Sequence, residues 1–132
     1  MRKKRVGKVT KIGDVSPWPH EEATAKALAL CGYDVTFIKA SDREYEHSAD
    51  AYVDNVLWEF KAPKGRKMSA VERNLRRGKD QSNKIVFDSR RMKGLPDEAI
   101  IREILSKAPF ISDIECVRYI NKHGKSIDIY NR

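Results

Sequence analysis

The 132-residue sequence has few of the residues that build metal-thiolate sites or disulfide frameworks. It contains only two cysteines, Cys31 and Cys116, and three scattered histidines. It has no C-x-x-C spacing and no Cys/His cluster, which disfavours a structural zinc site, a disulfide framework and zinc-dependent hydrolysis. We therefore expect both cysteines to be buried thiols.

Long apolar runs are also missing. No run approaches the ~18 residues of a transmembrane helix, and residues 1–6 lack the apolar stretch that follows the charges of a signal peptide. Repeats and low-complexity tracts are absent from the sequence. A soluble, monomeric protein with one main domain is expected, since a chain of this length typically forms one hydrophobic core.

Basic residues outnumber acidic ones, with 27 Lys and Arg against 19 Asp and Glu and a net charge of +8. Such a chain attracts polyanions, either nucleic acid or an acidic membrane surface. Residues 2–11 carry six basic residues and no acid. We predict a basic arm at residues 1–17, for which a frayed terminus is an equal alternative, followed by a single folded domain at 18–132.

Residue propensities and capping patterns predict a mixed β-sheet flanked by helices, an α/β (α+β) fold class. The expected helices cover residues 20–31, 69–80 and 96–108, the second with Ser69 as its cap. The expected strands cover residues 33–38, 50–53, 56–61, 85–88, 115–120 and 126–129, with a loop at 39–49.

The first predicted hairpin places two carboxylates face to face. If residues 54–55 form a two-residue turn, the register puts Asp50 directly across from Glu59. Opposed residues have Cβ atoms roughly 4.5–5.5 Å apart, where like charges destabilise a sheet unless a cation bridges them. A divalent cation would serve as that bridge.

Lys61 shares the face of Glu59 because side chains alternate along a strand. Its ammonium group could neutralise a phosphate oxygen or hold the attacking water. The alternative is an exposed strand face with salt-bridging charges, and a D-x(8)-E-x-K string is weak evidence when taken alone.

The first predicted helix offers a further carboxylate. Glu21 lies on the apolar stripe of Ala25 and Leu28, which favours a functional role. Glu22 lies about 100° away around the helix, and we interpret it as a solvated partner of Lys26.

A basic segment follows the hairpin and could carry a nucleic-acid backbone. Most of its cations, taken one by one, also fit a solvated helix face. The expected contacts are Lys64, Arg73 and Arg77 to phosphate, and Asn74, Gln81 and Ser82 as neutral hydrogen-bonding groups.

Several short motifs occur in an order and spacing that spans residues 18–130. They are His20-Glu21, Thr24-Ala25, Gly32-Tyr33-Asp34-Val35, Ser48-Ala49-Asp50, Trp58-Glu59-Phe60-Lys61-Ala62-Pro63, Asn74-Leu75-Arg76, Gln81-Ser82 and Val86-Phe87-Asp88. In this order they resemble the C-terminal tRNase toxin domains of contact-dependent growth inhibition proteins.

The resemblance implies a PD-(D/E)XK restriction-endonuclease-like fold with Glu21, Asp50, Glu59 and Lys61 as catalytic residues. It also implies tRNA or a related RNA as substrate, delivery into the cytoplasm of a competing bacterium, and neutralisation by an immunity protein. One departure is the turn at residues 54–55, where the family commonly has glycine.

The leading hypothesis is a metal-dependent endoribonuclease in which Asp50 and Glu59 hold Mg²⁺ or Mn²⁺, ions that prefer oxygen ligands. Glu21 would orient a metal-bound water and Lys61 would assist the nucleophile. Three alternatives stay open: a DNA endonuclease of the same fold, a non-catalytic nucleic-acid-binding module, and a metal-free RNase that uses His20 or His47.

Overall fold

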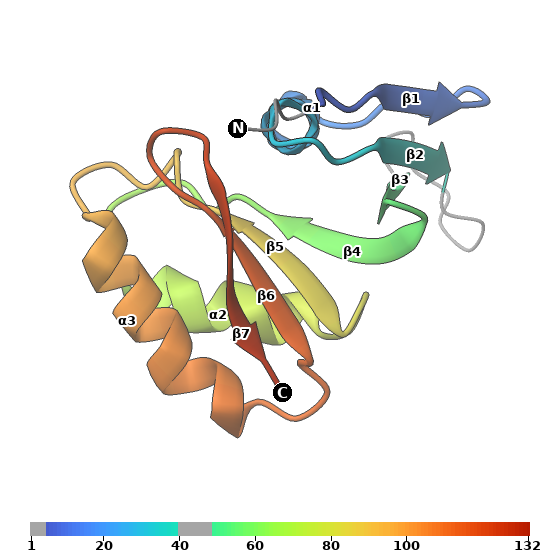
Figure 1. Cartoon of the computed structure of the whole chain (residues 1–132). Helices are drawn as coiled ribbons and strands as arrows, with labels where there is room; N and C mark the ends of the chain where they lie inside the picture. Colours follow the sequence, from blue (N-terminus) through green and yellow to red (C-terminus); the bar gives the residue numbers. More distant parts are fainter. Residues whose placement is uncertain (1–4, 40–48) are drawn as a thin grey trace. The chain divides into compact units, whose positions relative to one another are not determined.

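The computed structural model describes residues 5–39 and 49–132 (Figure 1). Residues 40–48 of the loop predicted at 39–49, with His47, lie outside the described residues, whereas Lys39 and Ala49 at its two ends belong to strands. The chain divides into two compact units, Met1–Trp58 and Glu59–Arg132, and each is described by itself.

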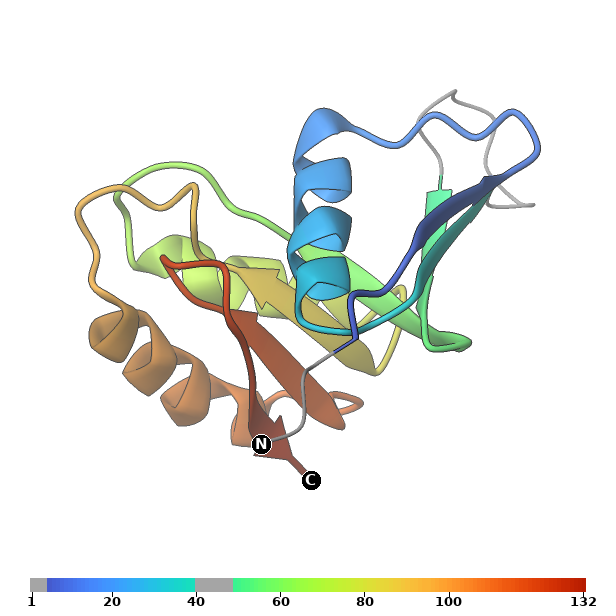
Figure 2. The same cartoon turned by 45° about the horizontal axis from the view of Figure 1, so that its top comes forward.

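Among its described residues, the first unit contains a helix and four paired strands, with β4 continuing into the second unit (Figure 2). Its elements are β1 (Val9–Ile12), α1 (Pro19–Leu30), β2 (Val35–Lys39), β3 (Ala49–Val53) and the start of β4 (Val56–Lys61). β1 pairs with β2 in parallel, and β2 pairs with β3 in antiparallel orientation. β1 falls within residues 1–17, where no strand was predicted.

The β3–β4 hairpin has the predicted register. Its pairs include Ala51 with Trp58 and Val53 with Val56. Asp54 and Asn55 have φ angles of 48° and 69°, the left-handed values that a two-residue hairpin turn requires at both positions. The Asp54 carboxylate also accepts a hydrogen bond of 2.9 Å from the backbone N–H of Asp34, which fixes the turn from outside. Asp and Asn thus serve where glycine is the usual choice.

The second unit contains the end of β4 and the remaining elements. They are α2 (Ser69–Gly78), β5 (Lys84–Asp88), α3 (Asp97–Lys107), the short 3₁₀ helix η1 (Ala108–Phe110), β6 (Cys116–Ile120) and β7 (Ser126–Asn131). β4, β5 and β6 pair in parallel, and β7 pairs with β6 in antiparallel orientation. Mixed pairing and flanking helices confirm the predicted α+β class.

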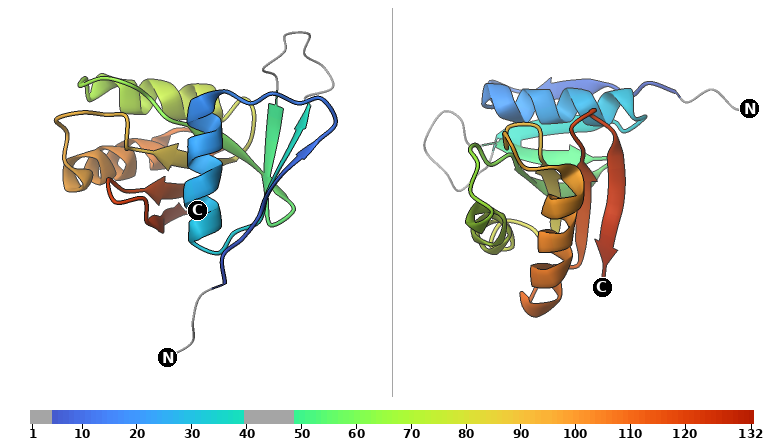
Figure 3. Two further views of the ribbon diagram at one scale, coloured as in Figure 1. Left: turned by 90° about the horizontal axis from the view of Figure 1, so that it is seen from above. Right: turned by 90° about the vertical axis from the view of Figure 1, so that its left-hand side faces the viewer.

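One hydrophobic core holds the second unit together. Leu75 of α2 and Ile104 of α3 pack in the same buried cluster as Phe87 of β5 and Tyr119 of β6. The two helices therefore cover the same face of the strands, as Figure 3 shows. Phe87 and Tyr119 are fully buried because the helices cover this face of β5 and β6, as is usual for parallel strands.

A polar network lies at the start of α3. The Tyr119 hydroxyl donates a hydrogen bond of 2.7 Å to Asp97, which also accepts from the backbone N–H of Lys122. Ser89 donates to the same carboxylate at 3.3 Å. Burial raises the pKa of the Tyr119 hydroxyl, and the neighbouring Asp97 adds to the rise.

Some predicted details are wrong. Ser69 is the first residue of α2 and Met68 precedes it as the cap, with no capping hydrogen bond from either side chain. Cys31 and Cys116 are free thiols, but both are only partly buried. No helix among the described residues is long and apolar enough to span a bilayer.

Candidate functional site

Glu59 and Lys61 lie side by side on one face of β4. Trp58 and Phe60 alternate with them and are buried. The Lys61 ammonium lies 3.4 Å from Oε2 of Glu59, and the two side chains are 21% and 22% exposed. The shared face predicted from the period of a strand is confirmed, and both groups remain within reach of a bound molecule.

Gly78 of α2 packs against Ile85 and lies beside the Lys61 side chain. A Cβ atom at residue 78 would lie 3.5 Å from Cε of Lys61 and 3.0 Å from Cδ1 of Ile85. Because Gly78 is the last residue of α2, the Lys61 side chain lies at the carboxyl end of this helix. That end carries partial negative charge and favours a cation.

The pair also occupies a favourable edge of the sheet. Lys61 is the last residue of β4 and pairs in parallel with Phe87, one residue before β5 ends at Asp88. The carboxyl ends of two parallel strands therefore meet beside Lys61. In open α/β sheets, ligands commonly bind outside this edge.

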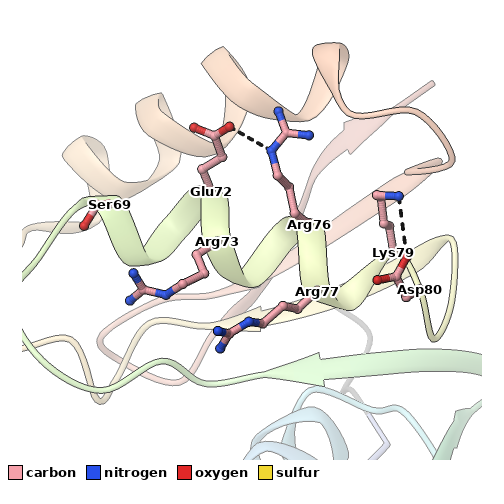
Figure 4. A pocket seen from close by; sticks show the side chains of 7 residues that line it. All are labelled: Ser69, Glu72, Arg73, Arg76, Arg77, Lys79 and Asp80. Carbon is pink, nitrogen blue, oxygen red and sulfur yellow. Dashed lines mark hydrogen bonds and ion pairs between the residues drawn. The ribbon is translucent and has the colours of Figure 1, made fainter.

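The exposed side of α2 forms a shallow pocket with a volume of about 590 Å³ (Figure 4). We call it the α2 pocket, and its lining residues are Ser69, Glu72, Arg73, Arg76, Arg77, Lys79 and Asp80. Arg73 and Arg77 extend from the same side of the helix, whereas Glu72 and Arg76 lie together on another side. Four of the lining residues are cationic, as expected for a surface that meets a polyanion.

The arginines of the α2 pocket differ in their partners. Glu72 accepts a hydrogen bond of 2.8 Å from Arg76, which lowers the pKa of the carboxyl, and it also pairs with Lys107 at 3.7 Å. No carboxylate among the described residues forms an ion pair with Arg73 or Arg77. Their guanidinium groups are thus available for phosphate, and the charge of Arg76 is largely matched.

The other predicted contact residues do not line the α2 pocket. The side-chain amide of Asn74 donates a hydrogen bond of 2.8 Å to the carbonyl of Ala70 within α2. Gln81 is exposed just beyond the helix, and Lys64 is exposed in the loop after β4. Ser82 accepts from the backbone N–H of Lys84 at 3.1 Å. These four contacts with nucleic acid remain predictions.

Glu21 has a structural partner in the first unit. Its Oε1 accepts a hydrogen bond of 2.9 Å from the backbone N–H of Trp18, the residue before α1. Ala25 and Leu28 are buried along the helix, as the periodicity predicted. Glu22 forms an ion pair with Lys11 of β1, whereas Lys26 was the predicted partner. Glu21 therefore caps α1, and its catalytic role remains a prediction.

Asp50 lies in β3, where it pairs with Ile38 of β2. It is partly buried and alternates with the buried Ala51, so it occupies the face predicted for it. The residue pairs of the hairpin ladder end at Ala51 and Trp58. The opposition of Asp50 to Glu59 remains a prediction.

The predicted metal site depends on the carboxylates of Asp50 and Glu59 as ligands. Within residues 5–39 and 49–132, no three Asp, Glu, His or Cys side chains gather as ligands. Mg²⁺ usually binds through one or two carboxylates, keeps several waters and takes further oxygens from substrate phosphates. The carboxylates of Asp50 and Glu59 suit such an ion by type and number.

His20 is one of the two histidines of the metal-free alternative, and it lies among the described residues. Its ring stacks on that of Trp18, with ring centroids 6.5 Å apart.

A second cluster of cations was not predicted from the sequence. It consists of Arg90, Arg91 and Lys93, in the loop after β5. The Arg-Arg-Met-Lys run that follows a buried strand could have revealed it.

Comparisons with known proteins agree with the motifs. The model of the family "Contact-dependent growth inhibition CdiA C-terminal domain" matches residues 47–126, which are 80 of the 132 residues. The comparison with curated protein sequences gives no match.

A solved structure, the CdiA-CT/CdiI toxin and immunity complex from Burkholderia pseudomallei, is similar with a TM-score of 0.65 and 19% sequence identity. The match covers 92% of this chain and 98% of that chain. At this identity the likeness shows a shared fold, and the family match shows membership. The chain belongs to the family of CdiA C-terminal domains of contact-dependent growth inhibition.

Proposed function

We propose that this domain is a metal-dependent endoribonuclease, a tRNA-cleaving toxin of bacterial competition. The observation that carries the proposal is the Glu59–Lys61 pair at the carboxyl end of β4, with the ammonium 3.4 Å from the carboxylate. Membership of a growth-inhibition family supports the role as a toxin. The preference for tRNA comes from the family resemblance.

Each residue of the proposed site has an assigned task. Lys61 donates to a non-bridging oxygen of the scissile phosphate and stabilises the charge that develops there. Asp50 and Glu59 would hold Mg²⁺ or Mn²⁺, which when bound supplies Lewis-acid polarisation of the phosphate and a more acidic water. Glu21 would orient the attacking water through its carboxylate.

Contacts outside the reacting centre hold the substrate. Arg73 and Arg77 bind phosphates through the α2 pocket, and Lys64 binds another after β4. Asn74 and Gln81 hydrogen-bond to sugars or bases. Most of the affinity would come from the phosphates and would fall as salt rises.

A protein partner and a route of action complete the proposal. The similar structure from Burkholderia pseudomallei is a toxin in complex with its immunity protein. We assign a cognate immunity protein to this domain as well. The domain would act as a monomer in the cytoplasm of a target bacterium after delivery from outside.

The experiment that tests the proposal compares substrates and metals. Purified domain is incubated with total RNA and with plasmid DNA, each with Mg²⁺ and with EDTA. RNA cleavage that requires Mg²⁺ is the expected result. Robust nicking of plasmid with intact RNA would establish a DNA endonuclease instead.

Two other outcomes identify the remaining alternatives. Cleavage that survives chelation would point to a metal-free mechanism based on His20 or His47. No product with any metal, together with binding that Asp50→Ala leaves unchanged or strengthens, would establish a non-catalytic binding module.

A further inference from the structure

A second pocket of the Glu59–Arg132 unit is lined almost entirely by cations. It has a volume of about 250 Å³ and lies between the loops that follow β4 and β5. We call it the basic pocket, and its lining residues are Lys64, Gly65, Arg66, Arg90, Arg91 and Lys93. It shares no residue with the α2 pocket and none with the proposed catalytic set.

Arg90 fixes one wall of the basic pocket. Its guanidinium donates to the two carboxylate oxygens of Asp88 at 2.9 and 2.8 Å, and its backbone N–H donates to the same residue at 3.1 Å. Asp88 is only 3% exposed. The hydrogen bonds from Arg90 to this carboxylate raise the pKa of Arg90. The pair therefore anchors the start of the loop on the buried end of β5.

Lys122 stabilises the same loop after β5. Its ammonium donates to the carbonyl of Ser89 at 2.6 Å and to the carbonyl of Met92. Met92 is fully buried, and its backbone N–H donates a hydrogen bond of 3.0 Å to the Ser89 carbonyl. The loop is thus a closed turn whose ends are fixed before any ligand arrives. A pre-ordered site loses less conformational entropy on binding.

The two loops are also joined to each other. The backbone N–H of Gly65 donates to the carbonyl of Arg91 at 3.3 Å. Gly65 has a φ angle of 112°, which side chains rarely tolerate, and a Cβ atom there would meet nothing within 4 Å. Glycine thus allows the loop after β4 to turn towards the loop after β5.

Most of the cations of the basic pocket have no ion-pair partner in the described part of the chain. No carboxylate of the described residues pairs with Lys64, Arg66, Arg91 or Lys93. Four close cations repel one another, and an anion between them relieves the repulsion. Arginine forks match the oxygens of a phosphate group, and lysine adds charge.

We infer that the basic pocket binds a phosphate of the nucleic acid next to the phosphate that is cut. Lys64 follows Lys61 by three residues, so their Cα atoms are at most about 11 Å apart. The pocket therefore lies within a short step along a polynucleotide from Lys61. This inference rests on the proposed function, since that function identifies the polyanion.

Binding measured without cleavage tests the pocket. In a Glu59→Gln background, the affinity for a labelled single-stranded RNA and for tRNA is measured over a range of salt concentrations. Arg91→Glu is compared with Arg102→Glu, which makes the same charge change on the exposed side of α3. Thermal unfolding verifies that each variant folds, and Lys93→Glu, at an exposed position, gives a second disruption of the pocket.

We expect Arg91→Glu to weaken binding at least tenfold more than Arg102→Glu. It should also reduce the slope of log affinity against log salt by about 0.7 for each phosphate of a single strand that the variant no longer neutralises. Arg91→Lys should restore most of the affinity. Equal affinities and slopes for the Arg91 and Arg102 variants, with Lys93→Glu also without effect, would overturn the inference.

The two proposals fail in different ways. If the wild-type domain cleaves RNA but the variants of the basic pocket bind as the Arg102 control does, the pocket is refuted and the nuclease stands. If no cleavage occurs but Arg91→Glu weakens binding selectively, the pocket stands as a phosphate site of a binding module and the nuclease is refuted.

Discussion

Gly78 of α2 lies where a side chain would press against Ile85 of β5. A Cβ atom on Gly78 would lie 3.0 Å from Cδ1 of Ile85, which is a tight approach, and 3.5 Å from Cε of Lys61, which is an ordinary van der Waals contact. The close approach of α2 to β5 thus depends on a residue without a side chain.

Gly78→Ala should therefore change both stability and activity little. Alanine favours a helix over glycine by about 1 kcal/mol, which offsets some of the crowding against Ile85. We expect a melting temperature within a few degrees of the wild type and RNA cleavage close to that of the wild type, because the alanine Cβ would meet Cε of Lys61 at an ordinary contact distance. A tenfold loss of cleavage at unchanged stability would show that Gly78 positions Lys61.

Arg73 and Arg76 give a matched pair on one helix. Arg73 has no carboxylate partner among the described residues, whereas Arg76 donates to Glu72 at 2.8 Å. Arg73→Ala should raise KM for RNA severalfold and reduce the salt slope of binding by about 0.7. Arg76→Ala should change both much less. The prediction is contradicted if the Arg76 variant loses as much affinity as the Arg73 variant.

Glu21 requires a substitution that separates capping from catalysis. Gln also accepts a hydrogen bond at this helical position, so Glu21→Gln should preserve the contact with the Trp18 N–H and the stability of α1. If the carboxylate orients a water, cleavage should fall about 100-fold with an unchanged melting temperature. Glu22→Gln is the control. Full activity of Glu21→Gln would leave this residue with its structural role alone.

The parts of the structure that local backbone geometry determines could be predicted from the sequence. The turn at Asp54 and Asn55 fixed the hairpin register, and strand alternation placed Glu59 beside Lys61. It missed β1, whose four residues are all exposed and show no alternation of apolar and polar side chains. A strand held mainly by backbone pairing leaves little trace in the residue pattern.

Contacts between residues that are distant in the sequence could not be predicted from local patterns. The capping contact of Glu21 joins a side chain to a backbone N–H, and the basic pocket joins loops about 25 residues apart in sequence. The individual residues are ordinary basic residues in turns. Only the packing of the loops after β4 and β5 brings them together, and no local periodicity encodes that packing.

Tyr119 predicts how stability depends on pH. Burial raises the pKa of its hydroxyl above the value of about 10 in the unfolded chain. The folded protein thus binds this proton more tightly, which stabilises it fully below pH ~10 and less as pH rises further. The stability advantage of wild type over Tyr119→Phe should therefore shrink as the pH rises above about 10.

Urea unfolding at several pH values measures this difference. The other tyrosines and Lys122 remain in the Phe variant, so subtraction isolates Tyr119. Loss of the hydrogen bond to Asp97 should make the variant less stable near neutral pH by about 1 kcal/mol. A difference that stays constant across the alkaline range would contradict the raised pKa.

The most direct test of the central claim is cleavage of total tRNA by Glu59→Gln and Glu98→Gln, with Mg²⁺ and with EDTA. The two variants remove the same charge, one beside Lys61 and one from an exposed position in α3. The account predicts that Glu98→Gln cleaves as the wild type does and stops in EDTA, while Glu59→Gln is folded, binds tRNA and yields no product. Undiminished cleavage by Glu59→Gln, or full cleavage by the wild type in EDTA, would contradict it.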